Sequence, residues 1–277
     1  MPIRDDRGFA LLFAMLVLVL VAALSEALLI EARQSRRSAS AELAIAKAKY
    51  LVDGAITMTI LTLIDGSDTV HVPLDGSETK LVVGASQVSV RLRSESGKIN
   101  VNYASEDQLS ELFQYAGLGP SEAEELASRV KAWREAKDVA NQGGEIQTYR
   151  DAMRPYAPSF SRFRSTDELR LVLGMTDATM ERIAPLITIS SQDGSVDRSV
   201  ASDQVLEALG ANGDALARGE LESRQDGRSA AKPRSPTIGE ALSIMAEFDA
   251  VGLHVLRSAI IEISGDVQRP YEILSWR

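Results

Sequence analysis

The chain has 277 residues, of which 45% are hydrophobic and 25% are charged, and its formal net charge at pH 7 is −9. These fractions are typical of a folded protein, and the acidic balance argues against a general nucleic-acid-binding protein, which usually presents a basic face. The chain has no cysteine, which excludes disulfides and thiolate metal or redox sites. We expect the two histidines, His71 and His254, to be ordinary surface or strand-edge residues rather than catalytic ones.

The first predicted element is one long helix that begins as an apolar run. Residues 8–25 carry no charge, and about 18 apolar residues is near the shortest run with which a helix crosses the hydrocarbon core of a bilayer. Proline is absent from residues 9–64 and good helix formers dominate them, which predicts one helix of roughly 80 Å. We expect a transmembrane part at 9–30 and an amphipathic continuation at 31–64.

The amphipathic part carries apolar residues at three- and four-residue steps, which places them on one face of the helix. These residues are Ile45, Ala48, Val52, Ile56, Ile60 and Leu63. We expect this face to pack against a folded domain, while the first half of the helix faces lipid.

A strand-rich segment follows the helix. Residues 67–79 are typical of an irregular connector. Residues 80–93 are rich in strand formers, and Gly84 permits a bend or a hairpin there. From Val88 to Arg93 valine and leucine alternate with serine and arginine, the pattern of a half-buried strand. A further short strand is expected to begin at Ile99.

The composition then becomes helical. Ser105 and Gln108 have the spacing of a capping box, in which each side chain satisfies a free backbone N–H at the helix start. A Gly-Leu-Gly-Pro loop at 117–120 separates this helix from a second one at 121–137. The unit resembles a helix-hairpin-helix, a motif whose loop N–H groups bind DNA phosphates. Because the loop is followed by acidic residues, beginning with Glu122, phosphate would be repelled, and we prefer a structural role.

Residues 138–164 are polar and contain two glycines and two prolines, which favours a long loop. Ser165 opens another capping-box pattern, Thr176 opens a further helix, and Pro185 ends that helix before a strand-like segment at 186–189.

Two segments of the chain are similar to each other. Residues 97–109 align without gaps with residues 194–206, and the glycine, the Ala-Ser pair and the leucine coincide. Two copies are too few for a solenoid. We therefore expect a duplicated strand-to-helix unit inside one helical domain.

The last part of the chain is again rich in strands. Residues 210–236 are polar and glycine-rich, typical of a mobile return segment, and three short strands are expected at 243–251, 255–264 and 271–276. The order of elements predicts an α+β fold, in which a long N-terminal helix packs on an antiparallel β-sheet and a large α-helical insert interrupts the strands.

Several parts of the sequence together resemble the K-type minor pseudopilins of type II secretion, within the type IV pilin-like superfamily. The first eight residues, MPIRDDRG, form a short charged segment that ends in Gly8, directly before Phe9. Three blocks are also similar to that family, namely GKINVN at 97–102, STDELRLVLGM at 165–175 and RPYEILSWR at 269–277. Most of the superfamily has a glutamate at the fifth residue after the leader, where this chain has Phe13, and the K type is the class known for lacking it.

The resemblance implies a processing step and a location. A prepilin leader peptidase would cut residues 1–8 between Gly8 and Phe9 and methylate the new N-terminus at Phe9. The helix would then anchor the protein in the inner membrane as a single span, with the bulk of the chain in the periplasm. This orientation rests on the resemblance, because arginines flank the apolar run on both sides.

The resemblance also implies a domain order and a role. Residues 65–101 would hold the first strands of the pilin sheet, 102–236 the helical insert, and 237–277 the strands that complete the sheet. The family is non-enzymatic and caps the tip of the pseudopilus with the I- and J-type minor pseudopilins, which link it to the major pseudopilin. No nucleic-acid partner is implied.

The resemblance also raises the question of calcium binding, because members of this family can bind calcium in the insert after the position of Trp133. The candidate ligands here are Glu135, Asp138 and Glu145. Calcium takes six to eight oxygen ligands, and Lys137 places a positive charge among these carboxylates. We therefore favour solvated charges at a helix end, and expect no cofactor.

Other interpretations fit parts of the sequence. A membrane-tethered helix-hairpin-helix DNA-binding protein is the main alternative function. A membrane-anchored periplasmic hydrolase is a third, although no nucleophile–histidine pair stands out.

The N-terminal apolar run also has other interpretations. A secretory signal peptide cut near residues 22–24 would have an apolar region of only 7–15 residues. A plain membrane anchor would not account for the Gly8–Phe9 junction, and a buried core helix is seldom apolar on all sides for so long.

Overall fold

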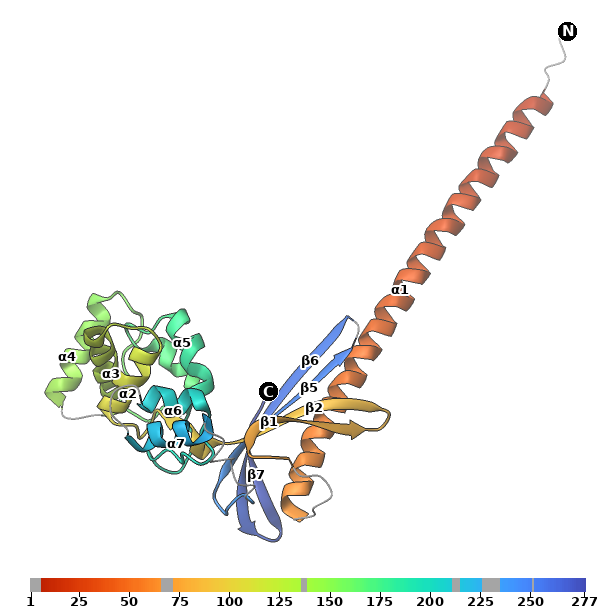
Figure 1. The fold of residues 1–277 in the computed structure, drawn as a ribbon. Helices are drawn as coiled ribbons and strands as arrows, with labels where there is room; N and C mark the ends of the chain where they lie inside the picture. Colours follow the sequence, from red (N-terminus) through yellow and green to blue (C-terminus); the bar gives the residue numbers. More distant parts are fainter. Residues whose placement is uncertain (1–5, 66–71, 136–138, 211–214, 226–234, 251) are drawn as a thin grey trace.

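The computed structural model shows a long helix, a five-stranded sheet and a helical insert (Figure 1). Only the backbone is described for residues 6–12, 27–30, 32 and 139–141, and the structure describes all other residues except 1–5, 66–71, 136–138, 211–214, 226–234 and 251. Helix α1 (Asp6–Asp65) is continuous, as its composition predicts. The predicted combination of α+β class and antiparallel sheet is confirmed.

The sheet is antiparallel throughout, with strand order β1-β2-β5-β6-β7. Its strands are β1 (Asp75–Val83), β2 (Ser86–Ser94), β5 (Ala241–Ala250), β6 (Leu253–Asp266) and β7 (Arg269–Trp276). Of the bend or hairpin that Gly84 permits, the structure has the hairpin, and the φ of 62° at Gly84 is one that glycine adopts without strain. The connector prediction for 67–79 is wrong from Asp75 onward, because that end of β1 pairs across a bulge with Arg93.

The second half of α1 packs against one face of this sheet. Val52, Ile56 and Ile60 are buried together with Val90 and Ile244. The predicted stripe is confirmed except at its start. Ile45 is 41% exposed, whereas Leu63 is partly buried and packs against the cluster.

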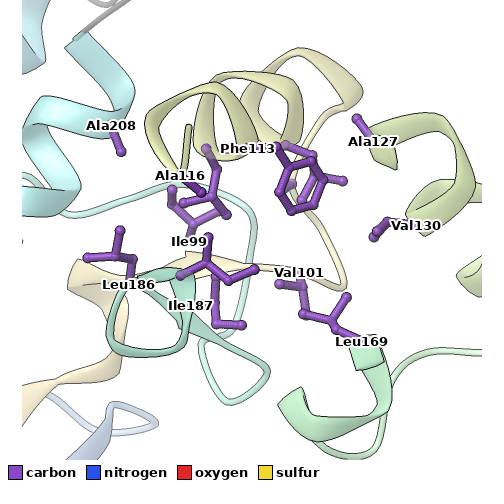
Figure 2. Close-up of a cluster of buried hydrophobic side chains, with 14 of the residues drawn as sticks. Ile99, Val101, Phe113, Ala116, Ala127, Val130, Leu169, Leu186, Ile187 and Ala208 are labelled. Carbon is purple, nitrogen blue, oxygen red and sulfur yellow. The ribbon is translucent and has the colours of Figure 1, made fainter. Parts of the chain in front are cut away.

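The insert lies between β2 and β5 and has its own hydrophobic core, part of which Figure 2 shows. Its elements are η1 (Glu95–Gly97), β3 (Ile99–Asn100), α2 (Glu106–Tyr115), α3 (Pro120–Arg134), α4 (Val139–Asp151), η2 (Thr166–Leu171), α5 (Asp177–Ile183), η3 (Ala184–Leu186), β4 (Ile187–Thr188), α6 (Asp203–Gly210) and α7 (Ala215–Gln225).

Three predictions about the insert need correction. The strand at Ile99 does not join the five-stranded sheet but pairs in parallel with Ile187, and the two side chains lie together in the insert core (Figure 2). The loop predicted at 138–164 contains α4, which Tyr149 anchors by being fully buried. Helix α3 starts at Pro120, a residue suited to the first helical position, rather than after it.

The predicted helix starts are otherwise largely confirmed. The Ser105–Gln108 capping box is present in full, and the Thr176 side chain caps α5. Ser165 also caps a helix, but it is the short 3₁₀ helix η2, and its oxygen accepts from the N–H of Asp167.

The repeat seen in the sequence forms two halves that pack reciprocally. A Cβ on Gly97 would lie 2.7 Å from the carbonyl oxygen of Val200, and one on Gly194 would lie 3.0 Å from that of Tyr103. Val200 and Tyr103 occupy equivalent places in the two copies. Each glycine thus contacts the same position of the other copy, as across a two-fold axis.

One arginine in each copy of the repeat donates hydrogen bonds that stabilise that copy. In the first copy Arg134, at the end of α3, donates from Nη1 to the carbonyl of Val101 and from Nη2 to that of Ala104, the latter at 2.6 Å. In the second copy Arg224, in α7, donates at 2.7 Å to each of the two equivalent carbonyls, those of Arg198 and Ala201. The duplicated unit is therefore a helical hairpin whose second helix holds the loop before the first.

Candidate assembly surface

The first half of α1 carries a long apolar surface. Every side chain described from residue 13 to residue 26 is exposed, and Phe13, Leu16, Leu20 and Leu24 are each more than half exposed. An apolar surface of this extent marks contact with a membrane or with other proteins.

Within the described part of the chain, no helix is long and apolar enough to qualify as a membrane span. Gly8 and Phe9 lie within the helical backbone of α1, and their side chains are outside the described set. Phe13 is 59% exposed and belongs to the apolar surface.

The apolar surface continues along the second half of α1 on the side away from the sheet. Leu43, Tyr50 and Leu61 are 56%, 76% and 53% exposed. Their spacings of 7 and 11 residues place them on one helix face, opposite the buried residues Val52 and Ile56. The sequence contains this second stripe, but composition alone does not tell which of two apolar stripes is buried.

The calcium candidates do not form a described site. Glu135 is exposed and pairs at 3.1 Å with the Nε of Arg134, Asp138 lies outside the described residues, and Glu145 is partly exposed on α4. Among the described residues, no three His, Cys, Asp or Glu side chains are placed to hold a metal ion.

The glycine loop between α2 and α3 has no N–H group left for a phosphate. The N–H of Gly117 donates to the carbonyl of Gln114 at 2.8 Å, and that of Leu118 to the carbonyl of Phe113 at 3.1 Å. The N–H of Gly119 donates to a carboxylate oxygen of Glu122 at 3.3 Å. The N–H groups with which such a loop would bind a phosphate are therefore already paired within the domain.

Arg182 completes this loop. Its Nη1 donates at 2.6 Å to the carbonyl of Ala116, which ends α2, and a Cβ on Gly117 would lie 2.6 Å from the same nitrogen. The loop thus binds a side chain of its own domain. Of the two histidines, His254 is an exposed strand residue whose Nδ1 lies 3.6 Å from a carboxylate oxygen of Glu247. His71 lies outside the described residues.

Three comparisons place the chain among known proteins. Residues 85–192 match the family model described as Type II secretion system (T2SS), protein K. The type II secretion system protein K of Pseudomonas aeruginosa (PAO1) is 24% identical over 230 residues, which cover 74% of this chain and 68% of the relative.

A solved structure agrees in fold. It comes from the crystal structure of the GspK-GspI-GspJ complex of the enterotoxigenic Escherichia coli type 2 secretion system. The similarity has a TM-score of 0.52 at 17% identity and covers 89% of this chain and 98% of that one.

Proposed function

We propose that this chain is a protein K of type II secretion, a minor pseudopilin at the tip of the pseudopilus, because residues 85–192 match the family model and a protein K relative is 24% identical. In this role it helps to start pseudopilus assembly, and so protein export across the outer membrane. Its partners are the I- and J-type minor pseudopilins, and through them the major pseudopilin. The protein acts by assembling with these partners and not as an enzyme.

The proposal rests on the difference between the two halves of α1. Its second half buries one face against the sheet, while the described side chains from 13 to 26 stay exposed and mostly apolar. A helix of this kind is stable in lipid, and it can transfer into the core of a helical filament, where apolar side chains of partner helices replace the lipid tails. The exposed stripe of Leu43, Tyr50 and Leu61 extends the contact surface beyond the membrane, into the periplasm.

Processing and location follow from the same proposal. Residues 1–8 are the leader, which the prepilin leader peptidase removes between Gly8 and Phe9 before methylating Phe9. Residues 9–30 then span the inner membrane, and the remainder of the chain lies in the periplasm. The strands within residues 75–94 and 241–276 supply the pilin sheet of this proposal, with the insert between them.

Mass spectrometry and co-purification test the proposal. The full chain is co-expressed with leader peptidase and with I- and J-type minor pseudopilins, and is extracted in detergent. We expect a mature N-terminus at Phe9 carrying one methyl group, and a complex with both partners. A Gly8→Glu variant, which should keep its leader, serves as the control. An uncleaved wild-type chain that purifies without either partner would count decisively against the proposal.

The DNA-binding alternative is disfavoured because the loop N–H groups are already paired within the domain. A gel-shift assay of the full chain at low salt tests it, because phosphate-driven binding is strongest there. We expect no shift.

A further inference from the structure

A cleft of about 260 Å³ lies between the insert and the sheet. The insert contributes Lys98, Arg164 and Ile187 to its lining, and the sheet contributes Leu274 and Arg277. Because both parts of the molecule form its walls, a ligand in this cleft would contact both.

Cationic side chains exceed acidic ones in the lining. The charge of Lys98 is compensated, since its Nζ lies 2.5 Å from a carboxylate oxygen of the buried Glu95. Arg277 approaches Asp167 only to 3.6 Å, and both side chains are more than half exposed. Such a surface pair is worth little and is readily exchanged for a better partner. Arg164 is exposed, and no ion pair joins it to another described residue.

The rest of the lining is polar on one side and apolar on another. Hydroxyl groups come from both parts of the molecule, with Ser165 and Thr166 from the insert and Ser258 and Ser275 from the sheet. The apolar lining residues include Ile187, Ile189, Ile260 and Leu274. Guanidinium groups bind carboxylates through two parallel hydrogen bonds, while the apolar wall suits a hydrocarbon side chain beside the carboxylate. A free phosphate or sulfate ion would leave that wall unused.

We propose that this cleft binds an acidic peptide segment. The guanidinium groups of Arg164 and Arg277 hold one carboxylate of the segment, and the wall of Ile260 and Leu274 holds a neighbouring apolar side chain. The volume lies slightly below the usual range of small-molecule pockets, about 300–1,000 Å³, and suits one or two side chains. The bound segment would hold the insert in a fixed position on the sheet.

Fluorescence anisotropy with the full chain in detergent tests the proposal. The probe is fluorescein-labelled Gly-Leu-Glu-Leu-Glu-Leu-amide, and its control has glutamine in place of both glutamates. We expect the acidic peptide to bind, the glutamine peptide to bind at least about tenfold more weakly, and the affinity to fall with added salt. Equal binding of the two peptides, or no binding at millimolar probe, would overturn the proposal. So would displacement of the probe by inorganic phosphate at concentrations below those of competing acetate, which would assign the cleft to phosphate.

Charge-matched variants locate the site. Arg164→Gln and Arg277→Gln should each weaken binding of the acidic peptide about tenfold. Arg154→Gln removes the same charge from an exposed insert residue outside the cleft lining and should leave binding unchanged. If all three variants bind alike, the peptide binds elsewhere and the assignment is wrong.

Hydrogen exchange then tests whether one ligand contacts both parts of the molecule. The bound acidic peptide should slow amide exchange at Thr166 in the insert and at Leu274 in β7 together. Protection confined to one of these two segments would contradict a ligand held between them.

Discussion

Arg134 is the buried charge on which the first half of the insert depends. It is 7% exposed and donates to the carbonyls of Val101 and Ala104. Arg134→Met keeps most of the side-chain volume but leaves two buried acceptors unpaired, so we expect a loss of about 3 kcal/mol in the free energy of unfolding. Urea unfolding of the full chain in detergent measures this loss, followed by the fluorescence of Trp133.

The equivalent arginine provides the matched control. The Arg224 side chain is 16% exposed, against 4% for Arg134, so water can replace part of its bonds. We expect Arg224→Met to cost about half as much. Both measurements use a Trp276→Phe background, in which Trp133 is the one remaining tryptophan. An equal or larger loss in the Arg224 variant would show that burial of the arginine does not determine the cost.

Tyr149 makes the stability of the insert depend on alkaline pH. Burial raises the pKa of Tyr149 above its ordinary value, the nearby charge of Glu145 raises it further, and the hydrogen bond from the N–H of Leu173 lowers it in part. Because the folded protein holds this proton more tightly than the unfolded chain, the stabilisation is complete below the unfolded pKa of about 10 and is lost as pH rises through the folded pKa.

The corresponding variant separates this effect from general alkaline unfolding. Tyr149→Phe should lower stability by about 1 kcal/mol at neutral pH, because the N–H of Leu173 loses its acceptor, and should reduce the fall in stability above about pH 10. Urea unfolding at a series of pH values measures both. Tyr50→Phe, at a 76% exposed position, should change neither quantity. An unchanged alkaline slope in the Tyr149 variant would contradict the assignment.

At the scale of secondary-structure elements, the two repeat glycines determine how closely the halves of the insert approach. A Cβ on Gly97 would lie within 3.0 Å of three backbone atoms of Val200 and Ala201, which cannot move aside as a side-chain end can. We expect Gly97→Ala to cost about 2–3 kcal/mol, and Gly194→Ala less, because its nearest contacts begin at 3.0 Å.

Gly219 offers a control for the glycine variants within helix α7. No atom lies within 4 Å of a Cβ built there, so Gly219→Ala should be neutral or stabilise the protein by up to about 1 kcal/mol. Thermal unfolding of the three variants ranks them. A Gly97→Ala protein as stable as the wild type would show that the halves can separate without cost.

The elements that local sequence determines are the ones that could be predicted. Helix α1, the hairpin at Gly84 and the Ser105 cap all follow from propensity, turn chemistry or spacing within a few residues. Helix α4 contains Gly143 and Gly144 and depends on the burial of Tyr149 against the rest of the insert, which no local pattern reveals. The same is true of β3, whose partner Ile187 lies far along the chain from Ile99.

At the scale of the whole molecule, the candidate surface was only half predictable. The apolar run at the start of α1 is evident from composition, but Leu43, Tyr50 and Leu61 become a surface only once the sheet covers the opposite face. The cleft beside Arg164 could not be predicted at all, because its walls come from segments distant in sequence. Local patterns thus predict the elements, whereas the surfaces between them depend on how the elements pack.

If the proposed function is correct, Phe13 should determine where the subunit lies in the assembled pseudopilus. The resemblance to the pilin-like superfamily implies a glutamate at this position in filament-forming relatives, whereas Phe13 is an uncharged, exposed residue of the apolar surface. In a stacked filament such a glutamate pairs with the N-terminal amine of a neighbouring subunit, and an unpaired buried carboxylate is costly. A subunit that lacks the charge is therefore suited to a position with no subunit stacked above it.

The substitution Phe13→Glu tests this argument in secreting cells with cross-linking along the pseudopilus. We expect the variant to cross-link within the filament body as well as at the tip, or to reduce secretion because the tip complex is destabilised. Met15→Glu places the same charge two residues further along the exposed apolar surface, where no pairing amine is expected, and should only impair assembly. The competing explanation is that the bulk of the helical insert alone prevents stacking. Normal secretion by Phe13→Glu, with cross-links confined to the tip, would favour that explanation and refute the charge argument.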